Sequence, residues 1–363
     1  MKKIKNTALA ISLFLFVILS GCKKEDKPNT EIPETGSNNS VVFVVNEGSF
    51  GSSNGSVSSF YTSTHQVIDD IFMTINNHPL GDVVQSMVLY KDKGYIVVNN
   101  SKKIEVVDRY SFLSKGTISG FTSPRYLLPV NDNKAYVSDW GVNNIKVVDL
   151  NSFVITDSIP AANGPEQMAM INNKVYVTNI GGYSIDSTLT IIDANTNAVI
   201  KTITVGMNPG NITTDYNGKI WVLCNGWYGV DWTGGTADDV AGSLVRINPM
   251  NDQIEATLPM GQFDHPLRLA MNKSKTAIYY LMGISGFDGN IFKFNVNSNT
   301  LSTAPLVIKN FYGLGIDPLN EDIYGAYSPV FGQSGYIFRY QNDGIFKDSA
   351  RVGIGPNGFV FNY

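Results

Sequence analysis

Large aromatic side chains recur at one position of this chain, a few residues after each of a series of short apolar stretches. Glycine and asparagine surround them, which is typical of loops. Rings on loops favour ligand binding, since they offer a large contact area and lose little entropy on ordering. The residues are Phe50, Trp140, Tyr183, Trp227, Tyr228, Trp232, Phe287 and Phe331, and at the equivalent place after one stretch the chain has Asn100 instead.

Polar side chains occupy a second recurring position, where the chain leads into the next apolar stretch. Arg125 directly follows a proline, and Arg268 follows one by two residues, so both are expected at the mouth of the fold. Gln167 and Asn211 stand at equivalent places. Together with the rings, this set predicts a ligand-binding face on loops. Asn46 and Asn179, at the ends of two apolar stretches, add amides to the same face. The alternative is structural: the rings fill gaps between sheets, and the asparagines close turns.

The chain holds few groups suited to catalysis. Its three histidines lie in unlike contexts, and there is neither a His-x-x-x-His motif nor a cysteine pair, which argues against a metal site of nitrogen or sulfur ligands. Nucleophile-elbow and phosphate-loop motifs are also missing from the sequence. We therefore expect no catalytic residues, no cofactor and no enzymatic activity. In the long loop 225–242, which reads as a flap, Asp231, Asp238 and Asp239 could ligate Ca²⁺ through oxygen.

The elements that position these residues are predicted to be β-strands. The stretch 174–179, Lys-Val-Tyr-Val-Thr-Asn, alternates β-branched and aromatic side chains and stops at a turn-forming asparagine. Related stretches recur at intervals of roughly 40 to 58 residues, a period typical of propellers and solenoids. They are Val41–Asn46, Gly94–Asn99, Lys134–Asp139, Lys219–Leu223, Ala277–Leu281 and Asp322–Gly325.

Each of these seven central strands is followed by two further strand-like runs, and all but the first are preceded by one. The sequence therefore predicts an all-β, seven-bladed β-propeller with four-stranded blades over residues 41–363. The domain opens with a central strand at Val41 and finishes with an innermost-type strand, Gly358–Tyr363. Pairing of the N-terminal and C-terminal strands in one blade would close the ring and remove an exposed edge.

Several residues that resemble ligands or nucleophiles are expected to be structural. Asp108, Asp149 and Asp193 end strand-like runs before polar turns, so their carboxylates should accept hydrogen bonds from the backbone of the turn. Cys224 lies in a strand-like run and is expected to be buried. Cys22 is the only other cysteine, and no intramolecular disulfide is predicted.

The N-terminus is predicted to be an export and anchoring segment. Residues 1–21 combine Lys2, Lys3 and Lys5 with a short apolar run, as in a signal peptide. Cys22 ends a Leu-Ser-Gly-Cys sequence similar to a bacterial lipobox, which predicts lipidation, and residues 22–40 form a flexible tether. The membrane contact would be through the lipid alone. Basic residues are neither abundant nor clustered, so nucleic acid is not an expected partner.

Residues 176–179, Tyr-Val-Thr-Asn, are the signature that names the YVTN family of β-propeller repeats, and the resemblance spans residues 41–363. A narrower resemblance rests on the lipobox, the Lys-Glu-Asp at 24–26, the opening Asn-Glu-Gly-Ser-Phe-Gly at 46–51 and the aromatic loops. Together these features resemble the Bacteroidetes surface lipoproteins that capture cobalamin. The resemblance implies a lipid-anchored, surface-exposed outer-membrane protein that binds a corrinoid (vitamin B12) and passes it to a TonB-dependent transporter.

A corrinoid suits the predicted face, because it is wide, has apolar edges and carries amide arms and a phosphate-bearing nucleotide tail. Two other classes stay open at this point. One is an adhesin that binds glycans or proteins through the same rings. The other is a propeller enzyme of the lactonase or quinoprotein type, which would need clustered acids, histidine or arginine around the central channel.

Overall fold

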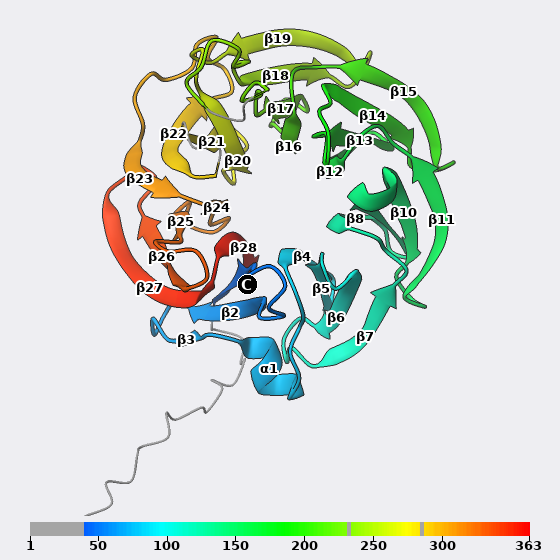
Figure 1. The fold of residues 1–363 in the computed structure, drawn as a ribbon, viewed down its shortest axis with the longest axis vertical. Coiled ribbons are helices and arrows are strands. Elements are labelled where there is room, and N and C mark those ends of the chain that lie inside the picture. The colour runs from blue at the N-terminus through cyan, green and yellow to red at the C-terminus, as the bar shows by residue number, and fades with distance from the viewer. Residues whose placement is uncertain (1–39, 231–233, 284–286) are drawn as a thin grey trace, which may run out of the picture. The chain divides into compact units, whose positions relative to one another are not determined.

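The computed structural model describes residues 40–230, 234–283 and 287–363. These residues form seven antiparallel sheets of four strands each, arranged around a central axis (Figure 1). The predicted all-β, seven-bladed propeller is confirmed. The predictions for residues 1–39, which include Cys22, and those for Asp231 and Trp232 concern residues outside the described ranges.

Each blade has an innermost, a second, a third and an outer strand, and we number the blades along the chain from the one that contains Val41. The innermost strands are β28 (Pro356–Asn362), β4 (Val84–Tyr90), β8 (Pro124–Asn131), β12 (Pro165–Ile171), β16 (Pro209–Thr214), β20 (His265–Met271) and β24 (Gly313–Ile316). The second strands are β1 (Val41–Asn46), β5 (Lys93–Val98), β9 (Lys134–Asp139), β13 (Lys174–Asn179), β17 (Ile220–Cys224), β21 (Ala277–Gly283) and β25 (Ile323–Tyr327). The third strands are β2 (Ser56–Tyr61), β6 (Lys103–Asp108), β10 (Asn144–Asp149), β14 (Thr188–Asp193), β18 (Ser243–Asn248), β22 (Gly289–Asn295) and β26 (Ser334–Tyr340). The outer strands are β3 (Val67–Ile68), β7 (Ser114–Ser119), β11 (Val154–Pro160), β15 (Ala198–Thr204), β19 (Gln253–Pro259), β23 (Val307–Phe311) and β27 (Phe346–Ile354).

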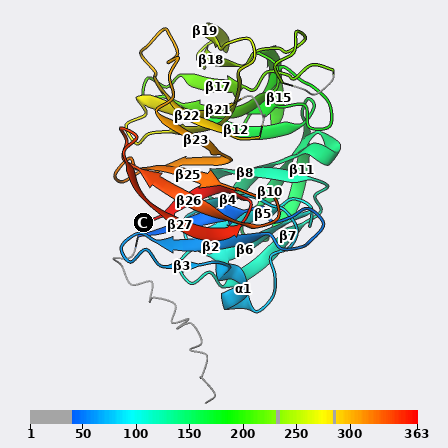
Figure 2. The same cartoon turned by 60° about the vertical axis from the view of Figure 1, so that its left-hand side comes forward.

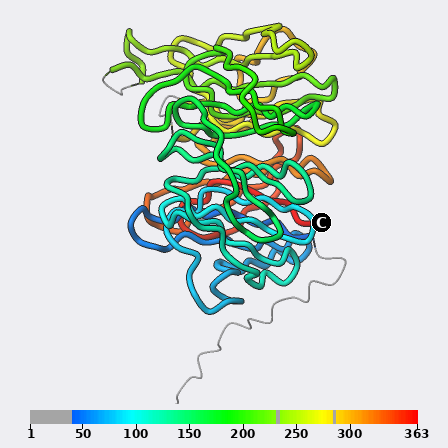
Figure 3. Tube along the Cα trace, turned by 90° about the vertical axis from the view of Figure 1, so that its right-hand side faces the viewer, coloured from blue at the N-terminus to red at the C-terminus, as the bar shows by residue number. Residues whose placement is uncertain are grey.

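The ring closes as the sequence predicts. In blade 1 the C-terminal strand β28 pairs with the N-terminal strand β1, with Val41 opposite Asn362 and Val45 opposite Gly358. The blue N-terminal and red C-terminal segments of the propeller therefore lie together in both side views (Figures 2 and 3). This pairing covers the edge of β1 that would otherwise have no neighbouring strand.

The repeated Lys-x-Tyr at the start of the second strands ties neighbouring blades together. In blade 4, the Lys174 Nζ lies 2.9 Å from an Asp252 carboxylate oxygen of blade 5, and the Tyr176 hydroxyl donates to the same carboxylate. In blade 3, Lys134 and Tyr136 donate to the Asn197 side-chain oxygen of blade 4 at 2.8 and 2.7 Å. The tyrosine ring fills the space between the sheets, and its hydroxyl donates a hydrogen bond to the next blade.

The asparagine that ends the signature holds its own sheet. Asn179 Nδ2 donates to Thr188 and Thr190 on the third strand, and Asn46 Nδ2 donates to Ser56 and Ser58. Both asparagines are fully buried. They therefore serve the structural role, which corrects the expectation that their amides belong to a binding face.

The structural roles expected of the strand-ending aspartates and of Cys224 are confirmed. Asp108, Asp149 and Asp193 accept backbone hydrogen bonds from the turns that follow them. These bonds hold the pKa of each carboxyl below its usual value. Cys224 is buried. Among the described residues, no helix has the length and apolar character needed to span a bilayer. The short helix α1 (Ile71–Asn76), which the sequence did not predict, packs beside β2 outside the ring (Figure 1).

Candidate ligand-binding face

One face of the propeller, which we call the crown, carries most of the predicted binding residues. Strands alternate in direction, so the loops that leave the second strands and the segments that enter the innermost strands lie on the same side of the ring. The described loops of the crown are 47–55, 99–102, 140–143, 180–187, 225–230, 234–242, 287–288 and 328–333.

β-bulges aim a ring of mostly polar side chains at the mouth of the channel. Six of the seven innermost strands have an irregular register near the crown, where an extra residue faces the second strand. A bulge re-aims the side chain of the extra residue and bends the strand. The residues at these bulges include Gln85, Arg125, Glu166, Gly210, Arg268 and Asn357.

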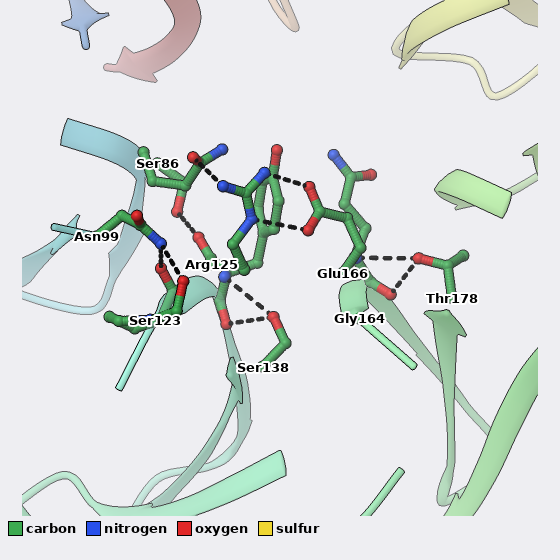
Figure 4. Close-up of polar contacts among 12 residues, drawn as sticks. Ser86, Asn99, Ser123, Arg125, Ser138, Gly164, Glu166 and Thr178 are labelled. Atoms are coloured by element: carbon green, nitrogen blue, oxygen red, sulfur yellow. Dashed lines mark hydrogen bonds and ion pairs between the residues drawn. The ribbon is translucent and has the colours of Figure 1, made fainter. Parts of the chain in front are cut away.

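A hydroxyl of the second strand stabilises two of these bulges. Thr178, the threonine of the signature, accepts from the Gln167 N–H at 3.0 Å, and Ser138 accepts from the Tyr126 N–H at 3.1 Å. Figure 4 shows both hydroxyls beside the bulged backbone, with Arg125 and Glu166 above them. The repeat motif thus positions the polar side chains of the mouth as well as forming the core.

Arg125 lies at the centre of a cluster that joins three blades. Its Nε and one Nη each donate to a Glu166 carboxylate oxygen at 2.9 Å, and the other Nη donates to Gln85 at 2.6 Å (Figure 4). Its guanidinium also stacks on Trp140, 3.8 Å from the ring centroid. Burial by itself lowers the pKa of Arg125, but the charge of Glu166 more than compensates and raises the pKa above its ordinary value. Arg125 is therefore a fixed cation, with each of its three side-chain nitrogens hydrogen-bonded.

Trp140 and Tyr183 form an aromatic corner above this cluster. Trp140 begins the short 3₁₀ helix η1 (Trp140–Val142), and its ring meets the edge of Tyr183 at 6.1 Å. Tyr183 is 81% exposed. The Tyr183 ring is thus available to a ligand, whereas the half-buried Trp140 joins the exposed ring to the arginine.

Arg268 has a different environment on the opposite side of the mouth. Its Nε donates to the Tyr312 carbonyl at 3.1 Å, and its guanidinium lies 5.2 Å from the Tyr312 ring centroid. Its φ of 47° is in the left-handed region, where a side chain other than glycine is strained. Burial alone lowers the pKa of Arg268. Its electrostatic interactions with nearby phenolic and carboxylate groups, of which Tyr126 contributes most, outweigh burial and raise the pKa.

A carboxylate offsets the charge of Arg268 from behind Tyr312. Glu47 accepts from the Tyr312 hydroxyl at 2.7 Å and from the Asn357 amide at 2.9 Å. Burial and the charge of Glu47 raise the pKa of the Tyr312 hydroxyl, so it remains a hydrogen-bond donor at neutral pH. Among the described residues, the two cations Arg125 and Arg268 at the channel mouth are therefore balanced by the two carboxylates Glu47 and Glu166.

At the channel mouth lies a small open cavity of about 180 Å³, lined by polar side chains and by apolar ones such as Met87 and Leu314. Its lining includes Gln85, Gln167, Asn211, Arg268 and Asn357. At roughly 30 Å³ per water, the cavity has room for about six waters. It can take one arm of a large ligand but not the ligand itself, which must lie across the crown.

Three phenylalanines expose their rings on the other side of the crown. Phe50, Phe287 and Phe331 are 75%, 75% and 85% exposed, on the loops of blades 1, 6 and 7. Phe287 and Phe331 line a groove of about 470 Å³ with Tyr312 and Glu47. Asn100 supports Phe50 indirectly, because its amide donates to the same Asp82 carboxylate oxygen that accepts from the Gly51 N–H.

The long loop of blade 5 is anchored by a buried histidine. Tyr228 stacks on His265 with the ring centroids 3.8 Å apart, and the two His265 nitrogens lie 3.2 and 3.3 Å from the Asn225 carbonyl and the Asp239 carboxylate. Trp227 is half-buried and pairs through its backbone with Val240. The two described aromatic rings of this loop are therefore both partly buried, whereas Val230 is exposed.

The described residues of the long loop do not support a Ca²⁺ site. Asp238 accepts hydrogen bonds from Val230 and Thr236, and Asp239 accepts from Gly235 and contacts His265. In the part of the chain that the structure describes, no three His, Cys, Asp or Glu side chains come together as a metal site.

The structure brings most of the predicted binding residues to one face, in three groups. Arg125, Trp140 and Tyr183 form the first, the channel residues Gln167, Asn211 and Arg268 the second, and Phe50, Phe287 and Phe331 the third. Asn100, Trp227 and Tyr228 support loops of the crown. Sequence reasoning missed Tyr126 and Tyr312, and it did not predict that Glu47 would bond to Tyr312 or Glu166 to Arg125. Tyr126 lies two residues after a proline and Glu47 lies in the opening motif, whereas no pattern in the sequence marks Tyr312.

The geometry defines a class of protein: a closed seven-bladed propeller with a candidate binding face at one mouth of its channel. Residues 40–346 match the family model described as a domain of unknown function, DUF5074. The match covers most of the chain, and the protein belongs to this family. No curated protein sequence matches it significantly.

Solved structures share the fold at low sequence identity. A quinonprotein alcohol dehydrogenase-like protein from Bacteroides thetaiotaomicron has a TM-score of 0.67 and 15% identity, over 90% of this chain and 80% of that one. A protein from Bacteroides fragilis, predicted to be a 6-phosphogluconolactonase, has a TM-score of 0.64 and 13% identity, over 91% of this chain and 100% of that one. A protein from Lactobacillus plantarum has a TM-score of 0.61 and 10% identity, over 90% and 100%. At these identities the similarity concerns the fold alone.

Proposed function

We propose that this protein is a non-catalytic capture protein that binds a corrinoid, such as cobalamin, across the crown. The observation that carries the proposal is the arrangement of the crown: exposed rings stand on two sides of a polar mouth without net charge. A wide, rigid ligand with apolar edges and amide arms has surfaces that match both parts.

The match extends to the hydrogen-bonding groups. Corrinoid side arms are primary amides, which both donate and accept, and the mouth offers amides at Gln85, Gln167, Asn211 and Asn357. The rings of Tyr183 and Phe331 expose most of their area, so a ligand that covers them gains apolar burial on both flanks. Because the channel cavity is small, the macrocycle would lie flat above it.

Titration of the soluble protein from Lys23 onward with cyanocobalamin, followed by calorimetry, tests the proposal. We expect a single site with a dissociation constant in the micromolar range or tighter. Trp140→Ala and Phe331→Ala should each weaken binding about tenfold or more, as is usual for central aromatic contacts. Phe346→Ala is the matched control, since this exposed ring lies on outer strand β27, away from the crown. Absence of binding, or equal loss in all three variants, would contradict the proposal.

Anchoring and delivery complete the proposed role. A lipid on Cys22 would hold the propeller at the outer membrane, with the crown free to pass its ligand to a TonB-dependent transporter. Mass spectrometry of the N-terminal peptide tests the lipid. Protease treatment of intact cells tests surface exposure, and co-purification with a transporter tests the partner.

A further inference from the structure

Arg268 differs from Arg125 in how many of its donors are used. Arg125 donates to Glu166 through two nitrogens and to Gln85 through the third. Arg268 donates only through Nε, to a backbone carbonyl. Among the described residues, neither of its Nη atoms has a hydrogen-bond partner, although both belong to a side chain that lines the channel cavity.

The strained backbone favours a functional role for this side chain. Arg268 is the extra residue of the bulge between Leu267 and Leu269, and its φ of 47° is unusual for a residue with a Cβ. Backbone strain of this kind persists only where the surrounding structure enforces it, often at ligand sites. Here it turns the guanidinium into the channel, stacked on Tyr312.

Further donors without partners share the same cavity. Among the described residues, the Asn211 side-chain amide makes no hydrogen bond, and Gln167 uses only its oxygen, which accepts weakly from Ile212 at 3.4 Å. Two Nη groups and two amide groups that face one small cavity are the donors that an oxyanion requires. A guanidinium is well suited to two oxygens of a phosphate or carboxylate, because its N–H groups form a planar fork.

The charge balance indicates which anion fits. Arg125 and Glu166 neutralise each other directly, whereas Glu47 opposes Arg268 only from behind Tyr312. A dianion would leave the mouth with two uncompensated negative charges, and a monoanion would leave one. The site should therefore prefer a monoanionic oxyanion, such as a phosphodiester or a carboxylate.

We propose that Arg268, with Asn211 and Gln167, forms a subsite for a monoanionic oxyanion at the crown end of the channel. If the ligand of the crown is a corrinoid, a step that rests on the proposed function, the group bound here is the phosphodiester of its nucleotide tail. A free small anion is the other source of the same chemistry.

The first arm of the test compares cobalamin with cobinamide, a corrinoid that lacks the nucleotide tail. The wild-type protein should bind cobalamin about 10- to 100-fold more tightly, the factor expected for charged hydrogen bonds. In Arg268→Gln this preference should disappear while cobinamide binding is retained, and Arg268→Lys should restore part of it. Arg246→Gln, remote from the crown, is the control for an arginine change. Equal affinities for the two corrinoids in the wild type would overturn the assignment of the phosphodiester.

The second arm uses dimethyl phosphate and reads the melting temperature, so it does not depend on a corrinoid. A saturable rise in Tm for the wild type that is lost in Arg268→Gln and kept in Arg246→Gln supports the subsite. No rise in the wild type, or the same rise in Arg268→Gln, overturns it. Failure of both corrinoids to bind, with this second arm positive, would refute the proposed function and leave the anion subsite standing.

Discussion

Glu166→Gln should be the most destabilising single polar substitution at the crown. Glu166 receives two hydrogen bonds of 2.9 Å from Arg125, and the two side chains are only 7% and 15% exposed. Breaking a buried ion pair by removing one partner costs roughly 3–5 kcal/mol, because the other charge stays buried and unpaired. Arg125 keeps Gln85 and the Trp140 ring, so we expect the lower end of this range, about 3 kcal/mol.

Thermal and urea unfolding measure this effect. At about 2.1 cal/mol/K per residue over roughly 320 residues, a loss of 3 kcal/mol lowers Tm by about 4–5 °C. The Arg125→Met/Glu166→Gln double variant should lose less than the sum of the two single changes, since it leaves no unpaired charge. Asp132→Asn, which breaks the exposed contact with Lys91, should leave Tm unchanged. Additive losses in the double variant, or a Glu166→Gln variant as stable as Asp132→Asn, would refute the reasoning.

Three further predictions concern the fold that supports the crown. Burial by itself raises the pKa of Asp252, but hydrogen bonds from Tyr176 and Lys174 outweigh burial and lower it. The stability that Asp252 contributes is therefore present above its unfolded pKa of about 3.9 and is lost as the pH falls through the lower folded value. Asp252→Asn should cost roughly 2 kcal/mol at pH 7 and flatten the acid limb of urea unfolding. Burial raises the pKa of the Cys224 thiol to about 12, so a thiol reagent should label it only after denaturation, and labelling of the native protein at neutral pH would contradict the burial. In Gly164→Ala the new Cβ would lie 2.1 Å from the Gly182 backbone nitrogen, so the change should cost about 2 kcal/mol or more and weaken ligand binding by displacing the loop of Tyr183. Gly51→Ala, with open space around the Cβ and also a positive φ, should cost only about 1 kcal/mol. Equal losses of stability in the two variants would refute the steric account.

The architecture was predictable because the information is local and repeated. β-branched and aromatic alternation at 174–179 and its relatives identified the second strands, and the repeat spacing fixed the blade count. The end-to-end pairing of β1 and β28 followed from which strand type begins and ends the domain. Helix α1 was missed because six residues carry too little periodic signal.

The site was predictable only in part, because bulges and contacts between blades leave no signature in the sequence. The prolines before the innermost strands pointed to Arg125, but the bidentate contact with Glu166, 41 residues later, depends on the register of two blades. Likewise nothing local to Tyr228 indicated that it would stack on His265 instead of standing at a loop tip. Asn179 was predicted to belong to the binding face, but the structure shows that its amide donates to the third strand of its own sheet.

The crystal structure of the protein with cyanocobalamin would test the central claim most directly. We predict that the corrin ring lies over the channel mouth, between the Trp140–Tyr183 corner and the Phe287–Phe331 groove, with one arm toward Arg268. A ligand bound instead on the outer side of the ring, or on the face opposite the crown, would contradict the account.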